Sequence, residues 1–119
     1  MDLIAELEKM GVDVNEGLER VMGDNSLYEM MLGMFIGSVN DNPVNLSDFD
    51  GGSVDSLIER IHMLKGVTGN LALTPLFDGY NQSLLLLRAE KPGEAKAEFT
   101  KMLPVQTKII DCIQQHQNG

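Results

Sequence analysis

Apolar residues recur at helical spacing along almost all of this 119-residue chain. The clearest case lies between residues 53 and 71, where five side chains follow one another at intervals of four, three, four and three: Leu57, Ile61, Leu64, Thr68 and Leu71. Such a seam places its members on one face of a helix that packs against other helices. No segment shows the sustained two-residue alternation that indicates a strand. The pattern therefore predicts an all-α chain.

Two short helical segments are expected before residue 24. An amphipathic helix over residues 2–10 ends at Gly11, because glycine readily adopts the left-handed conformation that follows many helices. Asn15 is expected to cap a further turn as far as Val21. Residues 1–23 are therefore predicted to form an N-terminal helical cap on the rest of the chain.

A longer helix is expected after this cap. Asp24 or Asn25 is its expected N-cap, and Asn42-Pro43 ends it, because the residue before a proline is disfavoured in helical conformation. Its buried stripe is predicted to consist of Leu27, Met30, Met31, Met34 and Phe35. Residues 42–52 then have the composition of a loop.

The remaining sequence predicts three more helices. Ser53 is the expected cap of the helix over residues 53–71, and Thr74 is the expected cap of the next one, with Pro75 at its first position. The last of the three follows a turn signal at residues 91–93. The predicted core positions of these last two helices are Leu76, Phe77, Tyr80, Leu84 and Leu87, and then Ala95, Phe99, Met102, Ile109 and Ile113.

Pro104 is expected to kink the last helix, because proline removes a backbone donor and clashes with the preceding turn. Four long helices joined by short connections are typical of an antiparallel four-helix bundle. We therefore expect such a bundle over residues 24–117, within a single domain that spans residues 1–119.

The charge of the chain excludes several classes of partner. Nine Lys plus Arg stand against eighteen Asp plus Glu, and tryptophan is absent, whereas nucleic-acid binders need cations and stacking platforms. No apolar run approaches the roughly 18 residues of a membrane span, and the acidic start is unlike a secretory signal. The lone Cys112 cannot form an internal disulfide, which fits a reducing compartment. A cytoplasmic monomer that binds neither nucleic acid nor membrane is expected.

The acidity is unevenly distributed. Residues 1–56 hold two basic and twelve acidic side chains, whereas residues 57–119 hold seven basic and six acidic ones. The acidic half is expected to be a solvated surface and not the working face of the molecule.

Two histidines are present, in different settings. His116 lies near the C-terminus among glutamines and is expected to be a frayed surface residue. His62 follows the seam residue Ile61, which rotates it by about 100° from the buried face. Its flank of the helix carries Ile58, Lys65, Gly66 and Gly69. Spacing alone leaves open whether His62 is an ordinary helix histidine or a working residue.

The glycines near His62 favour a working residue. Gly66 and Gly69 follow His62 by four and seven residues, and each costs about 1 kcal/mol relative to alanine inside a helix. We interpret them as a bare face that another molecule's backbone approaches. Lys65 lies one turn after His62, where it is either a surface lysine or a cation that holds phosphoryl oxygens.

The segment His62-Met63-Leu64-Lys65-Gly66, followed by Asn70-Leu71, resembles the histidine-containing phosphotransfer (HPt) domain, whose signature is H-x-L-K-G, small residues and an Asn-apolar pair. Leu76 also matches. Residues 11–18 and 23–32 look like the N-terminal region of stand-alone members, so the resemblance covers nearly the whole chain. Ala72, where the family often has glycine, and Leu84, where many members are acidic, depart from the pattern.

This resemblance implies a phosphorelay intermediate without kinase activity of its own. His62 would accept a phosphoryl group from a response-regulator receiver domain or a hybrid sensor histidine kinase and pass it on, with Lys65 holding its oxygens. An imidazole is largely neutral and nucleophilic near pH 7. The chain itself is expected to bind no cofactor, since the partner would supply the aspartate and Mg²⁺.

An antiparallel hairpin with its turn at residues 72–74 would place Gln82 or Ser83 opposite His62. Gln82 would then either bond the imidazole or a phosphoryl oxygen, or face solvent. Glu59 and His62 also form the Glu-x-x-His spacing of di-iron sites, but such sites need a second pair, which the sequence lacks.

The main alternative is a non-catalytic helical adaptor. Gly33, Gly37 and a methionine-rich stripe would suit an adaptable surface, and an adaptor should tolerate replacement of His62.

Overall fold

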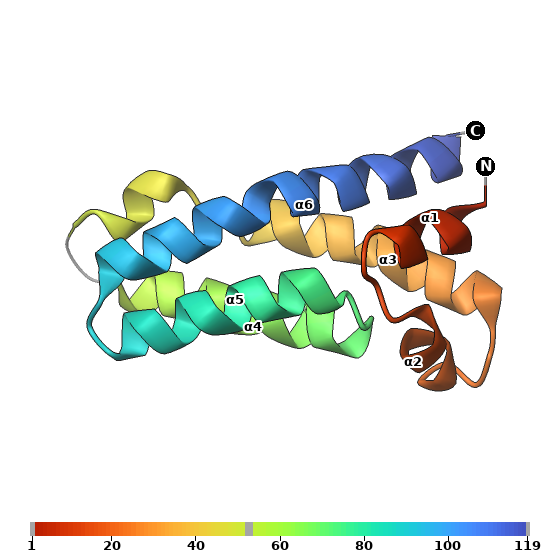
Figure 1. Ribbon diagram of the computed structural model, residues 1–119, viewed down its shortest axis with the longest axis horizontal. Coiled ribbons are helices and arrows are strands. Elements are labelled where there is room, and N and C mark those ends of the chain that lie inside the picture. The colour runs from red at the N-terminus through yellow and green to blue at the C-terminus, as the bar shows by residue number, and fades with distance from the viewer. Residues whose placement is uncertain (1, 52–53, 119) are drawn as a thin grey trace.

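The computed structural model describes residues 2–51 and 54–118, and its chain path is drawn in Figure 1. Across these residues the chain forms helices and no strands, so the all-α prediction is confirmed. The elements in chain order are α1 (Leu3–Lys9), α2 (Val14–Glu19), α3 (Asn25–Asp41), the 3₁₀ helix η1 (Leu46–Phe49), α4 (Asp55–Asn70), α5 (Thr74–Arg88) and α6 (Pro92–Asn118).

Successive long helices run in opposite directions (Figure 1). α4 packs on α5, α5 packs on α6, and α3 contacts both α4 and α6. Residues 71–73 connect α4 to α5, and residues 89–91 connect α5 to α6. Such short connections bring neighbouring helices back along one another. The α4–α5 hairpin thereby presents one continuous outer flank.

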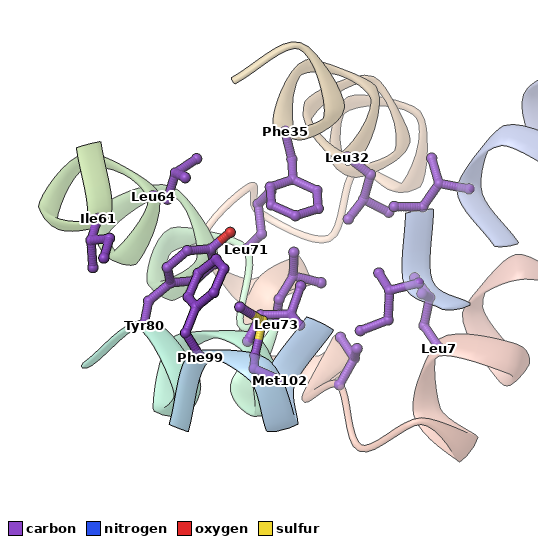
Figure 2. Packing of buried hydrophobic residues seen from close by; sticks show 14 of the residues in the cluster. Leu7, Leu32, Phe35, Ile61, Leu64, Leu71, Leu73, Tyr80, Phe99 and Met102 are labelled. Carbon is purple, nitrogen blue, oxygen red and sulfur yellow. The ribbon is translucent and has the colours of Figure 1, made fainter. Parts of the chain in front are cut away.

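The predicted seam of α4 is buried. Leu57, Ile61, Leu64, Thr68 and Leu71 each expose 2% or less of their surface. The hydroxyl of Thr68 donates to the Leu64 carbonyl at 2.8 Å, which satisfies the one polar group of the seam. Figure 2 draws Ile61 and Leu64 of α4 in the cluster of buried side chains that also contains Tyr80 and Phe99. Burial of this face turns the His62 flank outward.

The predicted stripe of α3 was partly wrong. Met30 and Met34 expose 57% and 65% of their surface, whereas Tyr28, Leu32 and Phe35 are buried. Figure 2 shows Leu32 and Phe35 directed into the cluster of buried side chains. Tyr28 can occupy a buried position because its hydroxyl donates to the Leu71 carbonyl at 2.9 Å. The buried face of α3 therefore consists of Tyr28, Leu32 and Phe35, and Met30 and Met34 lie outside it.

The N-terminal caps differ in part from expectation. Asp13, and not Asn15, caps α2, because its carboxylate accepts the Glu16 N–H at 3.2 Å. Asp24 caps α3 by accepting the Leu27 N–H at 3.1 Å. Gly11 has φ of 90°, which is the left-handed conformation that its position required.

Two boundaries further along the chain also differ. α5 begins at Thr74 itself, with Leu73 as the residue before it and Pro75 at the second helical position. The expected cap Ser53 lies outside the described residues, and α6 continues through Pro104. None of the helices in residues 2–51 and 54–118 combines the length and apolar character needed to cross a bilayer.

The segment expected to be a plain loop after α3 contains η1. Its end is tied down by two ion pairs: Arg60 of α4 lies 3.1 Å from Asp48, and Lys96 of α6 lies 2.9 Å from Asp50. The Asn45 N–H and the Arg60 side chain both donate to Asp48, and they lower the pKa of its carboxyl. Residues 42–51 therefore include a short helix that ion pairs link to α4 and α6.

α2 is fastened to the turn between α4 and α5. The Asp13 N–H donates to the Ala72 carbonyl at 3.0 Å, and the Tyr28 hydroxyl reaches the adjacent Leu71 carbonyl. A Cβ at Gly17 would lie 2.9 Å from the Leu71 carbonyl oxygen and 2.6 Å from Tyr28 Cε1. Only glycine allows α2 to approach this turn so closely. Figure 1 shows α2 at this end of the hairpin.

Replacement of Tyr28 by phenylalanine should destabilise the protein by about 1–2 kcal/mol, because the Leu71 carbonyl loses its buried donor. Burial and, to a smaller extent, the charge of Asp13 raise the pKa of Tyr28 from 10.0 to about 12. The neutral phenol therefore stabilises the fold below pH 10.0, and this contribution is lost as the pH rises toward about 12. Urea unfolding at several pH values should show the difference between the two proteins shrinking over that range. Equal midpoints near neutral pH would contradict the prediction.

Candidate functional site

The exposed flank of the α4–α5 hairpin is hollowed into an open pocket of about 540 Å³. His62 stands on this flank with its side chain exposed, and Lys65 is half-buried beside it. Three helices and the turn between two of them contribute to the lining, which consists of Glu16, Arg20, His62, Lys65, Gly66, Gly69, Asn70, Ala72, Thr74, Phe77 and Asp78. The structure thus brings four of the sequence-predicted residues together: His62, Lys65, Gly66 and Gly69.

The charges of the pocket are balanced. Lys65 and Arg20 are its cations, and Glu16 and Asp78 are its carboxylates. Arg20 Nη2 lies 2.7 Å from Glu16 Oε1. The expectation that the acidic N-terminal half stays away from the site was therefore wrong. The hydrogen bond between Asp13 and Ala72 holds α2 at the hairpin turn. The local sequence contains no signal that predicts this long-range contact.

Lys65 has an aromatic neighbour. Its Nζ lies 6.0 Å from the centroid of the Phe77 ring, which is the outer limit of a cation–π contact. Such a contact favours orientations of the ammonium group on the pocket side of α5 and leaves its donors available to a ligand. Phe77 and Lys65 therefore border the pocket side by side.

Glycine stands at positions 66 and 69 of the pocket for different physical reasons. A Cβ at Gly69 would lie 3.1 Å from two ring carbons of Phe77, so packing within the chain favours glycine there. A Cβ at Gly66 would meet no atom within 4 Å. Packing inside the chain therefore does not require glycine at Gly66, although glycine costs about 1 kcal/mol in a helix. The bare-face interpretation now rests on Gly66, and Gly69 is explained by Phe77.

Two other predicted site residues lie outside the lining. Ile58 is half-buried and packs against the core one turn before His62. Gln82 is exposed on α5 and does not line the pocket, whereas Asp78, one turn earlier on the same flank, does. The pocket extends from His62 toward the hairpin turn and so includes earlier residues of α5, Thr74, Phe77 and Asp78.

His116 is placed differently from expectation. It lies within α6, and its Nε2 is 3.2 Å from Glu29 Oε1 on α3, so it is a surface contact between helices and not a frayed end. In the part of the chain that the structure describes, no three His, Cys, Asp or Glu residues cluster in a way that could hold a metal ion.

Sequence reasoning did not assign seven of the lining residues to the site: Glu16, Arg20, Asn70, Ala72, Thr74, Phe77 and Asp78. A signal for Phe77 existed, because an unexplained glycine at Gly69 near a helical turn indicates a bulky side chain opposite it. Glu16 and Arg20 had no comparable signal, since an i,i+4 ion pair on a short helix looks like ordinary surface charge. Comparison of the chain with protein-family models, curated proteins and solved structures returns no match. The arrangement of the pocket is therefore the guide to function.

Proposed function

We propose that this protein is a histidine phosphotransfer protein, in which His62 carries a phosphoryl group between aspartyl phosphates of receiver domains or a hybrid histidine kinase relay. The observation that supports this most strongly is the open space beside Gly66, one turn from the exposed His62. The four long helices would form the antiparallel four-helix bundle of such proteins. Lys65 would hold the transferred group.

The transfer needs only a nucleophile and access. The lone pair of a neutral imidazole nitrogen of His62 attacks phosphorus, and a P–N bond forms. The P–O bond of the partner's acyl phosphate breaks, and its electron pair returns to the aspartate as a carboxylate. The second imidazole nitrogen keeps its proton, so phosphohistidine forms without a separate base. Reversal of the same steps delivers the group to the next receiver.

The shape of the pocket supports this reaction. The partner's carboxylate must come within bonding distance of the imidazole, so the partner's backbone must closely approach α4. Gly66 leaves the space for that approach. Lys65 can bind the oxygens that carry the charge of the moving group, with the Phe77 ring beside it. The partner's receiver domain would supply its own aspartate and Mg²⁺.

Phosphoryl transfer to His62 tests this proposal directly. A panel of receiver domains labelled on aspartate is mixed with the protein, and the label is located by mass spectrometry after digestion at alkaline pH. The expected result is an acid-labile, alkali-stable phosphoryl group on His62. A panel that leaves the protein unlabelled would overturn the proposal. Binding of receivers without labelling would favour the adaptor alternative.

Lys65→Ala should slow transfer by about tenfold, because it removes a charge-assisted hydrogen bond to the phosphoryl group at a half-buried position. Lys65→Arg should retain most of the rate. Lys108→Ala removes the same charge from an exposed position on α6 and serves as the control. Rapid-quench measurement of phosphohistidine formation reports the rates. An equal loss in both alanine variants would contradict a local role for Lys65.

A further inference from the structure

The pocket beside His62 contains a second cation from a different part of the chain. Arg20 follows the last residue of α2, and its guanidinium pairs with Glu16 one turn earlier at 2.7 Å. Each of the two side chains exposes 47% of its surface. Both residues line the same pocket as His62 and Lys65. The pocket therefore has a second cation besides Lys65 of α4.

The position of Arg20 is determined by the fold. α2 is held at the hairpin turn by the hydrogen bond from the Asp13 N–H to the Ala72 carbonyl. Gly17 removes the Cβ that would otherwise keep α2 away from the Leu71 carbonyl. Glu16 and Arg20 stand one helical turn apart on α2, so both reach the pocket from the same side.

A phosphoryl group on His62 would change the charge balance of the pocket. The charged and titratable side chains that line it are Glu16 and Arg20 from α2 and its C-terminal end, His62 and Lys65 of α4, and Asp78 of α5. A phosphoryl group adds about two negative charges and three acceptor oxygens, which Arg binds through two parallel hydrogen bonds. The exposed pair with Glu16 is weak because water screens it. Exchange of Glu16 for phosphoryl oxygens therefore costs Arg20 little.

We propose that Arg20 is a second phosphoryl-binding residue, which Glu16 holds while His62 is unmodified and which turns to the phosphoryl oxygens after transfer. This inference rests on the proposed function of His62. Lys65 and Arg20 then approach the group from α4 and α2, on different sides of the pocket. The Glu16–Arg20 pair sets how strongly the protein retains the phosphoryl group, because Glu16 competes with it for the guanidinium.

The equilibrium of phosphoryl exchange with a receiver domain tests this role. Arg20→Gln should lower the equilibrium ratio of phosphorylated to unphosphorylated protein by about fivefold. Glu16→Gln should raise this ratio by a similar factor. The pH midpoint of the phosphohistidine signal in phosphorus NMR should move in opposite directions, up by about half a pH unit in Arg20→Gln and down in Glu16→Gln. A purely structural ion pair predicts the same direction for both variants, because both break it.

A double variant separates partner exchange from a simple effect of nearby charge. In the Arg20→Gln background, Glu16→Gln should have little further effect, because Glu16 acts by holding Arg20. Fully additive effects, or shifts in the same direction, would overturn the inference. Arg88→Gln removes the same charge at the far end of α5 and should change neither readout. Failure of the unmodified protein to accept phosphate would instead refute the function of His62.

Discussion

Replacement of His62 by glutamine should reduce phosphoryl transfer to the background level. Glutamine keeps a polar side chain of similar length, but it lacks a nitrogen lone pair that can attack phosphorus. His62 is exposed and does not belong to the buried core. The helical content and the midpoint of urea unfolding should therefore stay close to those of the unmodified protein. Labelling by a phosphorylated receiver domain measures the loss.

His116→Gln provides the matched control for this experiment. It removes the only other histidine by the same substitution, and its contact with Glu29 lies at the surface between α6 and α3. Transfer should continue at the unmodified rate. Label that persists in His62→Gln, or label that is lost in His116→Gln, would place the phosphoryl group elsewhere and refute the assignment.

Gly66→Leu should slow transfer by about a hundredfold, because the inserted side chain occupies the space through which a partner approaches, and overpacking costs about 1–3 kcal/mol. The same substitution should not harm the fold. A Cβ at this position meets no atom within 4 Å, and leucine is a better helix former than glycine. The protein should therefore gain thermal stability while it loses activity. Rapid-quench kinetics and far-ultraviolet circular dichroism measure the two effects.

Gly37→Leu is the control for Gly66→Leu. Gly37 lies four residues before the end of α3, as Gly66 lies four residues before the end of α4, and a Cβ there also meets open space. Both variants should gain similar helix stability. Only the variant in α4 should transfer slowly, and the defect should appear mainly in the apparent affinity for the receiver. A defect of equal size in both variants would mean that Gly66 has no special relation to the partner.

The sequence predicted those parts of the fold that depend on local spacing. The seam of α4 could be read directly, because five positions on one face leave little choice of orientation. The end of the first helix at Gly11 followed from the left-handed backbone that glycine adopts. The seam placed His62 on an exposed flank of α4.

The features that sequence reasoning missed depend on contacts between distant segments. The stripe of α3 was misread because Tyr28 is buried through a hydrogen bond to Leu71, forty-three residues away. The wall that α2 adds to the pocket depends on the contact of Asp13 with Ala72. Gln82 was placed from the symmetry of the hairpin, but the pocket extends toward the turn and takes in Asp78 instead. Periodicity carries no information about such pairings.

The attachment of α2 has a thermodynamic consequence. α1 and α2 contain only seven and six residues, so their helical state depends on contacts with the rest of the chain. A segment of this kind opens at a lower free energy than the core of the molecule, and hydrogen exchange of its amides measures that energy. Every opening of α2 removes one wall of the pocket and takes Arg20 away with it. The fraction of molecules that present the complete pocket therefore depends on the local unfolding equilibrium of α2, a segment that is distant in sequence from His62.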